Sequence, residues 1–337
     1  MSGHFVVSLD FELHWGVFDQ RTVESYKENL SNVPVVIHRL LEMADKYDVK
    51  LTFATVGFLF AKDKQDLLNH LPEQKPTFVH QRYSPYPLID SIGNDEKDDP
   101  YHYAHSLIKK IRDNGNHEIG THTFCHYYCH ELGQTVEQFE DDLKSAIAIA
   151  KQMDIKLESI IFPRNMMDLR YEQDLPYAET FYKLGFKSFR GKEKAYIYNI
   201  FTQKFYHGWY IFKILRMMDA YSNVTGMNTY NMDELYVKNK PLNIPSSRLL
   251  RAYNKTMSFL EPLKVHRITS GMRHAAQKNE LFHLWWHPHN FGTHMDENFK
   301  NLEAIFKEYS ILNKTKGFQS ETMTSLTNQI ISRHENI

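Results

Sequence analysis

The chain has 337 residues, which is enough for one large barrel or for two modest domains. Hydrophobic residues make up 42% of it and charged residues 24%, as in an ordinary soluble globular protein. The 40 Lys and Arg residues nearly cancel the 41 Asp and Glu residues. This balance lacks the basic excess of a nucleic-acid-binding protein, so we expect no nucleic-acid partner.

The sequence shows no feature of export or of membrane insertion. Its first residues, MSGHFVVSLDFELHWG, have neither a basic n-region nor a long apolar stretch before the first acidic residue. No window approaches the roughly 18 apolar residues that a membrane span needs. The only two cysteines are Cys125 and Cys129, so a disulfide framework is not expected. We therefore expect a cytoplasmic protein without stable membrane insertion, and the sequence leaves its oligomeric state open.

Apolar runs of strand length alternate with amphipathic segments along the first half of the chain. The predicted strands are 4–9, 51–55, 117–122, 159–162 and 186–189, followed later by 281–286. The predicted helices are 36–47, 104–114, 135 to about 153, 176–184 and about 296–311. Strands that alternate with helices of this length indicate βαβ units, and hence a parallel sheet in an α/β protein.

Two segments interrupt this alternation. Residues 60–103 are polar and rich in prolines and acids, which is typical of a long excursion. Residues 191–278 are rich in Tyr, Met and Lys, and include WYIFKILRMMDAY, a run compatible with helix or strand. Because no Gly/Ser-rich linker bounds the second segment, we interpret it as a large insertion within one domain spanning 1–337.

Polar residues stand at the ends of four predicted strands. They are Asp10, His122, Pro163-Arg164 and His287. In a parallel barrel or open sheet, active residues gather at the carboxyl ends of the strands. The pattern therefore predicts one site built from four strands.

His122 and His126, in THTFCH, are the candidate metal ligands. A spacing of four places two imidazoles on the same side of a helical turn or a tight loop. Two ordinary histidines would produce the same pattern, and alone it is a site in about one case in four or five. Cys125 and Cys129 lack a second ligand pair elsewhere, so we interpret them as packing residues. His130 continues the spacing as a weaker candidate.

Asp10 and Glu12 at the first strand end supply carboxylates beside these histidines. Strand-end carboxylates often serve as caps for neighbouring amides, which is the simpler explanation. Next to a metal site, one would bind the ion and the other would take a proton from water.

At this point the residues carry a family resemblance. SLDFELHWG, TFATVGFL, EIGTHTFCH, the strand end Phe162-Pro163-Arg164-Asn165 and WHPHN occur in the order of the motifs of the polysaccharide deacetylases. This family comprises the NodB-like carbohydrate esterases of the family 4 type. The resemblance covers residues 1–190 and about 280–325. It implies an incomplete or distorted (β/α)7-type barrel with parallel strands and a large insertion, acting as a metal-dependent hydrolase of carbon–nitrogen bonds.

The resemblance also implies roles for single residues. The expected metal ligands are Glu12, His122 and His126, and the expected catalytic residues are Asp10 as base, His287 as acid and Arg164 as the partner of Asp10. The ion would be divalent, with zinc favoured and cobalt, nickel or manganese as alternatives. Two motifs depart from the family pattern. Phe11 separates two carboxylates where the family has adjacent aspartates, so the roles of Asp10 and Glu12 could be exchanged, or Asp10 could bind the metal alone. Arg164 follows the proline instead of preceding it.

Further residues have alternative explanations. His289 competes with His287 for the acid role, and we expect only one of them to face the pocket. Trp285 and Trp286 should likewise divide, one buried and one stacking on sugar. In the insertion, Asp219 and residues 244–248 either contact a substrate phosphate or carboxylate or, more commonly for such residues, form loop structure.

The predicted substrate is an N-acetylated sugar, specifically a cytoplasmic precursor of a surface polysaccharide or lipopolysaccharide. Two alternatives remain open at this stage. The chain could hydrolyse another linear or cyclic amide, or it could be an inactive barrel that binds a glycan or a pathway partner.

Overall fold

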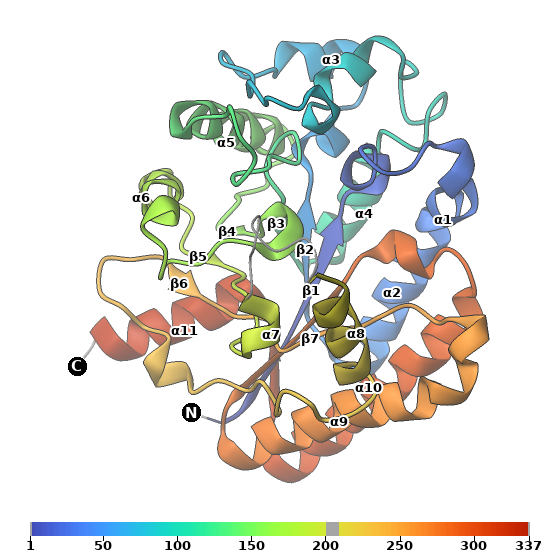
Figure 1. Cartoon of the computed structure of the whole chain (residues 1–337), viewed down its shortest axis with the longest axis vertical. Helices are drawn as coiled ribbons and strands as arrows, with labels where there is room; N and C mark the ends of the chain where they lie inside the picture. The colour runs from blue at the N-terminus through green and yellow to red at the C-terminus, as the bar shows by residue number, and fades with distance from the viewer. Residues whose placement is uncertain (1, 200–208, 336–337) are drawn as a thin grey trace.

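The computed structural model describes residues 2–199 and 209–335 (Figure 1). The strands are β1 (His4–Phe11), β2 (Leu51–Thr55), β3 (Glu118–Thr121), β4 (Ser159–Ile160), β5 (Ser188–Phe189), β6 (Leu242–Asn243), β7 (Arg248–Leu249), β8 (Leu281–Trp286) and β9 (Gln319–Glu321). The helices are α1 (Lys27–Ser31), α2 (Val33–Tyr47), α3 (Lys64–Asn69), α4 (His105–Asn114), α5 (Val136–Lys151), α6 (Leu175–Lys183), α7 (Tyr196–Asn199), α8 (Trp209–Asp219), α9 (Glu261–Lys278), α10 (Met295–Lys316) and α11 (Met323–Glu335).

The strands form one curved sheet in which every pairing between named strands is parallel. Its order is β6-β5-β4-β3-β2-β1-β8-β7, and β9 pairs with the first half of β1. Strands and helices alternate along the chain, and the helices surround the sheet (Figure 1). The predicted incomplete parallel barrel is therefore confirmed.

The central strands owe their position to continuous apolar sequence. All eight residues of β1 are buried, as expected for a strand covered on both faces. The helices present one apolar stripe to the sheet, as in α2, where Val36, Ile37 and Leu40 are buried. Thr135 caps α5 in a capping box with Gln138, which confirms the predicted helix start.

A single stretch of chain, residues 242–249, joins the two edges of the sheet. Its first part is β6, on β5, and its last part is β7, on β8. Between them, the Ile244 amide donates to the carbonyl of Phe189, and the Ser247 amide donates to the carbonyl of His283. The segment predicted as an insertion thus contributes two strands of the sheet and also contains α9, which leads into β8.

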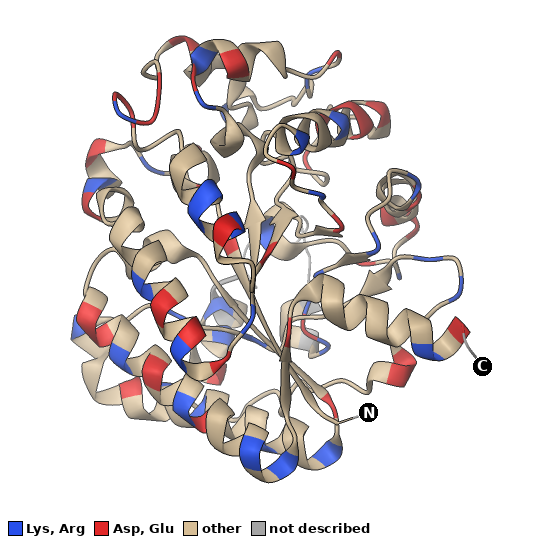
Figure 2. Ribbon diagram, turned by 180° about the vertical axis from the view of Figure 1, so that it is seen from behind, with Lys and Arg blue, Asp and Glu red and all other residues tan. Residues whose placement is uncertain are grey.

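The rear of the molecule carries interspersed charges of both signs on its helices (Figure 2). There α9 packs on α10, and α10 packs on α2. Among residues 2–199 and 209–335, no helix combines the length and the hydropathy that a membrane crossing requires.

Candidate metal centre and active site

Glu12, His122 and His126 meet at the carboxyl end of the sheet. The Nε2 atoms of His122 and His126 lie 3.2 and 3.3 Å from Oε2 of Glu12. All three side chains are buried, and their ligand atoms lie within 4.8 Å of one another. Two imidazoles and one carboxylate form a donor set that suits a divalent ion with open positions for water and substrate. The three predicted ligands therefore fit a metal ion.

Two of the ligands directly follow a strand, and the third lies in the sharply turning loop after His122. Glu12 directly follows β1, and His122 directly follows β3. The loop after His122 contains two residues with positive φ, Thr123 at 65° and His126 at 61°, so the pair lies on a tight loop instead of a helix. Asp142 of α5 holds this loop, because its carboxylate accepts hydrogen bonds from the amides of Phe124 and Cys125 at 2.7 and 3.1 Å.

The electrostatics favour an ionised Glu12 carboxylate and a neutral His126 imidazole. Burial opposes ionisation of Glu12, but the charge of His287 and hydrogen bonds from His122 and His126 bring the pKa of Glu12 well below its ordinary value. Burial lowers the pKa of His126, which favours the neutral ring that binds metals.

Asp10 lies beside this triad and is held by an arginine that the sequence analysis did not select. Arg190, directly after β5, donates from Nη1 and Nη2 to the two carboxylate oxygens of Asp10 at 2.7 and 2.8 Å. Burial alone would raise the pKa of Asp10, but the Arg190 guanidinium brings it below its ordinary value. Arg190 follows the predicted strand 186–189, so its strand-end position was the signal that could have identified it.

Further contacts fix Arg190 in this position. Its Nε donates to Asn165, and its Nη1 also donates to Ser8, whose hydroxyl lies 2.8 Å from Nε2 of His283. The guanidinium carbon lies 4.2 Å from the ring centroid of Trp285, a cation–π contact.

The predicted pairing of Arg164 with Asp10 is wrong. Arg164 turns away through a left-handed backbone conformation, with a φ of 63°. Its guanidinium hydrogen-bonds Glu131 and lies 4.2 Å from the ring centroid of Tyr128. It also lies 3.6 Å from Asp19. Arg164 therefore links three loops around the site, and Arg190 is the arginine that bonds Asp10 among the described residues.

His287 and His289 both approach the site, whereas we expected only one to do so. Nε2 of His287 lies 3.6 Å from both Asp10 and Glu12, and Nε2 of His289 lies 4.0 Å from Glu12. His289 lies in the turn Pro288–Phe291, and its ring lies 5.3 Å, centroid to centroid, from that of His287. The side chain of His287 is 25% exposed and that of His289 only 3%, so His287 is the one that a substrate can reach.

The two tryptophans divide as expected. Trp286 is fully buried, whereas Trp285 is only partly buried and lies 5.7 Å, centroid to centroid, from the ring of His287. Trp285 is therefore the tryptophan that lies beside His287.

Gly16 packs directly behind Glu12, a constraint that the sequence analysis missed. It ends the turn Leu13–Gly16, and a Cβ at this position would lie 1.9 Å from Cδ of Glu12. The turn is anchored by His14, whose Nδ1 lies 2.8 Å from Nε2 of His102, and His102 in turn contacts Asp99 at 2.7 Å. Only glycine leaves room for the carboxylate in this position.

Replacing Gly16 by Ala is expected to displace the Glu12 carboxylate and to weaken zinc binding by about 10- to 100-fold, the usual effect of disturbing groups that orient a ligand. Isothermal titration with zinc measures this effect. Gly271→Ala is the matched control, because its Cβ would meet the Phe282 ring at 2.4 Å, near the opposite end of β8 from His287. An unchanged zinc affinity in Gly16→Ala would contradict the predicted role.

Other predicted residues lie away from the metal triad. His130 hydrogen-bonds Asp174 at 2.6 Å, and Cys125 is a buried free cysteine. Asp219 and Arg248 form an ion pair with each other, and both are buried. Cys125 therefore agrees with its interpretation as a packing residue. Asp219 and Arg248 agree with the simpler explanation that they stabilise the structure of the insertion.

Comparison with known proteins gives a family match over part of the chain. Residues 18–168 match the model of the polysaccharide deacetylase family. This span includes His122 and His126 but ends before Arg190 and His287. No sequence among the curated proteins matches the chain.

Solved structures share the fold at low sequence identity. A proposed polysaccharide deacetylase from Mycobacterium smegmatis matches with a TM-score of 0.60 and 13% identity, over 99% of this chain and 92% of that protein. A second proposed polysaccharide deacetylase, from Pseudomonas aeruginosa PAO1, matches with a TM-score of 0.54 and 11% identity, over 99% and 91%. The predicted family resemblance is confirmed by the family match, and the predicted fold by the structures.

Proposed function

We propose that this polysaccharide deacetylase-type chain, a hydrolase of the class that acts on carbon–nitrogen bonds other than peptide bonds, removes the N-acetyl group of a sugar with the help of a divalent ion. One observation carries the proposal. The buried triad of Glu12, His122 and His126 stands against an arginine-held carboxylate, Asp10, and a partly exposed imidazole, His287. This combination supplies a metal site, a base and an acid within one small volume.

The geometry supports a separate role for each of these residues. Glu12, His122 and His126 would hold the ion, for which we propose zinc. When bound, such an ion polarises the amide carbonyl and brings the pKa of water towards about 7. Asp10 lies outside the triad and would accept the proton of the attacking water. Arg190 keeps Asp10 ionised through two charge-assisted hydrogen bonds, so the base is available at neutral pH.

Departure of the amine requires a proton, and we assign its delivery to His287. Its Nε2 lies 3.6 Å from the base Asp10, and its side chain is partly exposed. A proton taken up at Asp10 would thus be matched by one delivered from His287 to the departing amine. Trp285, beside His287, presents an aromatic face on which a sugar ring would stack.

The test is metal content measured together with acetate release. We expect one divalent ion for each purified chain, and acetate release from N-acetylated sugars that depends on this ion. His122→Ala removes a ligand and should lower metal content and activity together. His130→Ala is the matched control, since His130 bonds Asp174 instead of the triad. A wild-type chain that binds no ion in stoichiometric amount, with His122→Ala equal to it in activity, would refute the proposal.

The finer proposal is that the substrate is a cytoplasmic precursor of a surface polysaccharide. It predicts acetate release from nucleotide- or lipid-linked N-acetylated sugars, but not from chitin or peptidoglycan. The opposite selectivity would overturn this part alone and leave the hydrolase assignment in place.

A further inference from the structure

Helix α8 turns an apolar stripe away from the protein. Ile214, Met217 and Met218 are 53%, 39% and 48% exposed, and their spacing places them on one side of the helix. On its other side, Asp219 is completely buried. The exposed stripe therefore belongs to a helix with a defined inner face.

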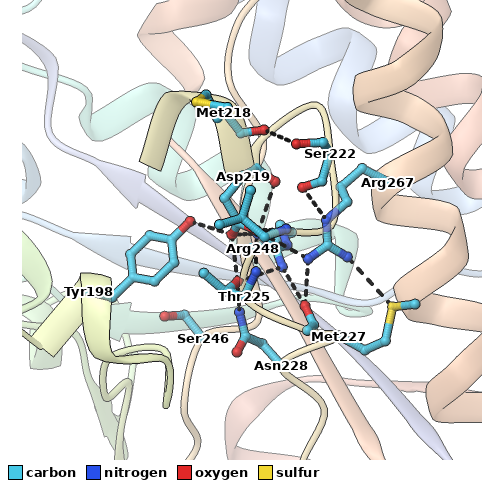
Figure 3. Close-up of polar contacts among 12 residues, drawn as sticks. Tyr198, Met218, Asp219, Ser222, Thr225, Met227, Asn228, Ser246, Arg248 and Arg267 are labelled. Carbon is cyan, nitrogen blue, oxygen red and sulfur yellow. Dashed lines mark hydrogen bonds and ion pairs between the residues drawn. The ribbon is translucent and has the colours of Figure 1, made fainter. Parts of the chain in front are cut away.

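A buried ionic cluster fixes which side of α8 faces inward (Figure 3). Asp219, the last residue of α8, pairs with Arg248 of β7 and with Arg267 of α9. Its carboxylate also accepts hydrogen bonds from the Thr225 hydroxyl at 2.7 Å and the Tyr198 hydroxyl at 2.9 Å. Two elements of the sheet-and-helix framework thus hold the end of α8, so rotating the stripe inward would break a buried ion-pair network.

More exposed apolar residues belong to the same part of the chain. Phe259, in the turn just before α9, and Leu263, in the first turn of α9, are 76% and 49% exposed, and Val224, five residues after α8, is 44% exposed. Arg267 of α9 joins the two regions, because its Nε donates to the carbonyl of Ser222, three residues after α8, at 3.2 Å. Residues 191–278 contribute seven of the fourteen large hydrophobic side chains that are exposed among the described residues.

The same segment is strongly basic. Residues 191–278 contain 14 Lys and Arg against five Asp and Glu, a net charge of +9. Because the whole chain has a net charge of −1, the remainder carries −10. Lys213, Arg216, Arg251 and Lys255 are the basic residues on and after α8 that accompany the apolar side chains. Apolar side chains among basic ones characterise helices that lie in the interface of an anionic membrane.

We propose that α8 and the start of α9 form a docking surface for an anionic membrane. The side chains that enter the headgroup region would be Ile214, Met217, Met218 and Phe259. The basic residues of the segment would be attracted to the lipid phosphates. The opposite charge of segment and lipid favours this partner over a second copy of the chain, since two copies would bring two segments of +9 together. The proposal concerns this surface and does not depend on the reaction at Glu12 and Asp10.

The experiment is sedimentation of the full chain with vesicles of phosphatidylcholine alone or of phosphatidylcholine with phosphatidylglycerol. We expect binding to the anionic vesicles that weakens as salt is added, because screening reduces the attraction. The variant Met217→Ser/Met218→Ser/Phe259→Ser should bind at least about tenfold more weakly, since the buried apolar area is lost. Val35→Ser/Ile311→Ser is the matched control, because both residues are exposed on the rear helices α2 and α10, and it should bind like the wild type.

Three results would overturn the proposal. Equal binding to both kinds of vesicle would exclude recognition of anionic lipid. Equal binding by the triple variant and the wild type would exclude the apolar stripe. A dimer in light scattering that the triple variant dissociates, without vesicle binding by the wild type, would assign the surface to a second copy. Thermal unfolding of each variant shows that it is folded, so lost binding is attributable to the surface.

Discussion

Replacing Arg190 by Met is expected to destabilise the protein by about 3–5 kcal/mol and to move the acidic limb of its pH–activity profile to higher pH. The stability loss follows because Asp10 is buried and Arg190 binds both of its carboxylate oxygens. Methionine retains much of the volume and the contact with Trp285 but removes the charge. Denaturant unfolding at neutral pH measures the first effect.

The direction of the pH effect follows from the pKa of Asp10. Burial alone would raise this pKa, and Arg190 brings it below the ordinary value. A carboxyl group with a depressed pKa in the folded protein adds stability above its unfolded pKa of about 3.9, and that stability is lost as pH falls through the folded pKa. Without Arg190 the pKa of Asp10 rises, so the base is protonated over a wider acidic range and activity at low pH decreases.

Arg164→Met separates this effect from general loss of an arginine near the site. Arg164 contacts Glu131 and Tyr128, so its replacement should leave the acidic limb where it is in the wild type. If Arg164→Met moves the limb and Arg190→Met does not, the assignment of Arg190 to Asp10 fails.

The second expected result distinguishes the base from the metal ligand. Asp10→Asn should retain the metal ion and reduce turnover by about 10²- to 10⁴-fold, the usual contribution of a positioned base. Glu12→Gln should instead lose metal affinity, because Oε2 of Glu12 is the carboxylate oxygen nearest to both imidazoles. Metal analysis of each purified variant, with initial rates at saturating added zinc, separates the two outcomes.

The reverse pattern would exchange the two roles. If purified Asp10→Asn contains no metal and purified Glu12→Gln retains it, Asp10 is the ligand and Glu12 is the base. Asparagine and glutamine preserve the shape of each side chain. Asp10→Asn leaves the buried Arg190 guanidinium without its carboxylate, so we expect this variant to lose stability as well, and its folded fraction must be known before its turnover is compared. Circular dichroism of both variants checks this point.

The sequence was sufficient for the strongly periodic elements. Strands 51–55 and 281–286 coincide with β2 and β8, and Thr135 caps α5 as predicted. In these elements apolar pattern, length and capping chemistry agree, so local sequence determines the structure. The placement of Asp10, His122 and His287 at strand ends followed from the same patterns.

The missed elements lacked a local signal. Strands β6 and β7 have two residues each, too few for a period, and exist because their neighbours β5 and β8 supply hydrogen-bond partners. Helix α9 was missed because its buried face includes Lys264 and Arg267, which interrupt the apolar pattern of the sequence. Arg190 stands at a predicted strand end, but a strand-end position does not name a partner, and only the fold brings it to Asp10, 180 residues away.

During synthesis, β1 emerges long before two of the strands that pair with it. β8, at Leu281–Trp286, pairs along one edge of β1, and β9, at Gln319–Glu321, pairs along part of the other edge. At about 5–20 residues per second, roughly 15–50 seconds separate β1 from β8 on a ribosome. During that interval an apolar strand has an open edge, which is the feature that promotes mispairing between chains. A nascent chain halted before Leu281 should therefore bind holdase chaperones more strongly than the completed protein, and release them once β8 has emerged.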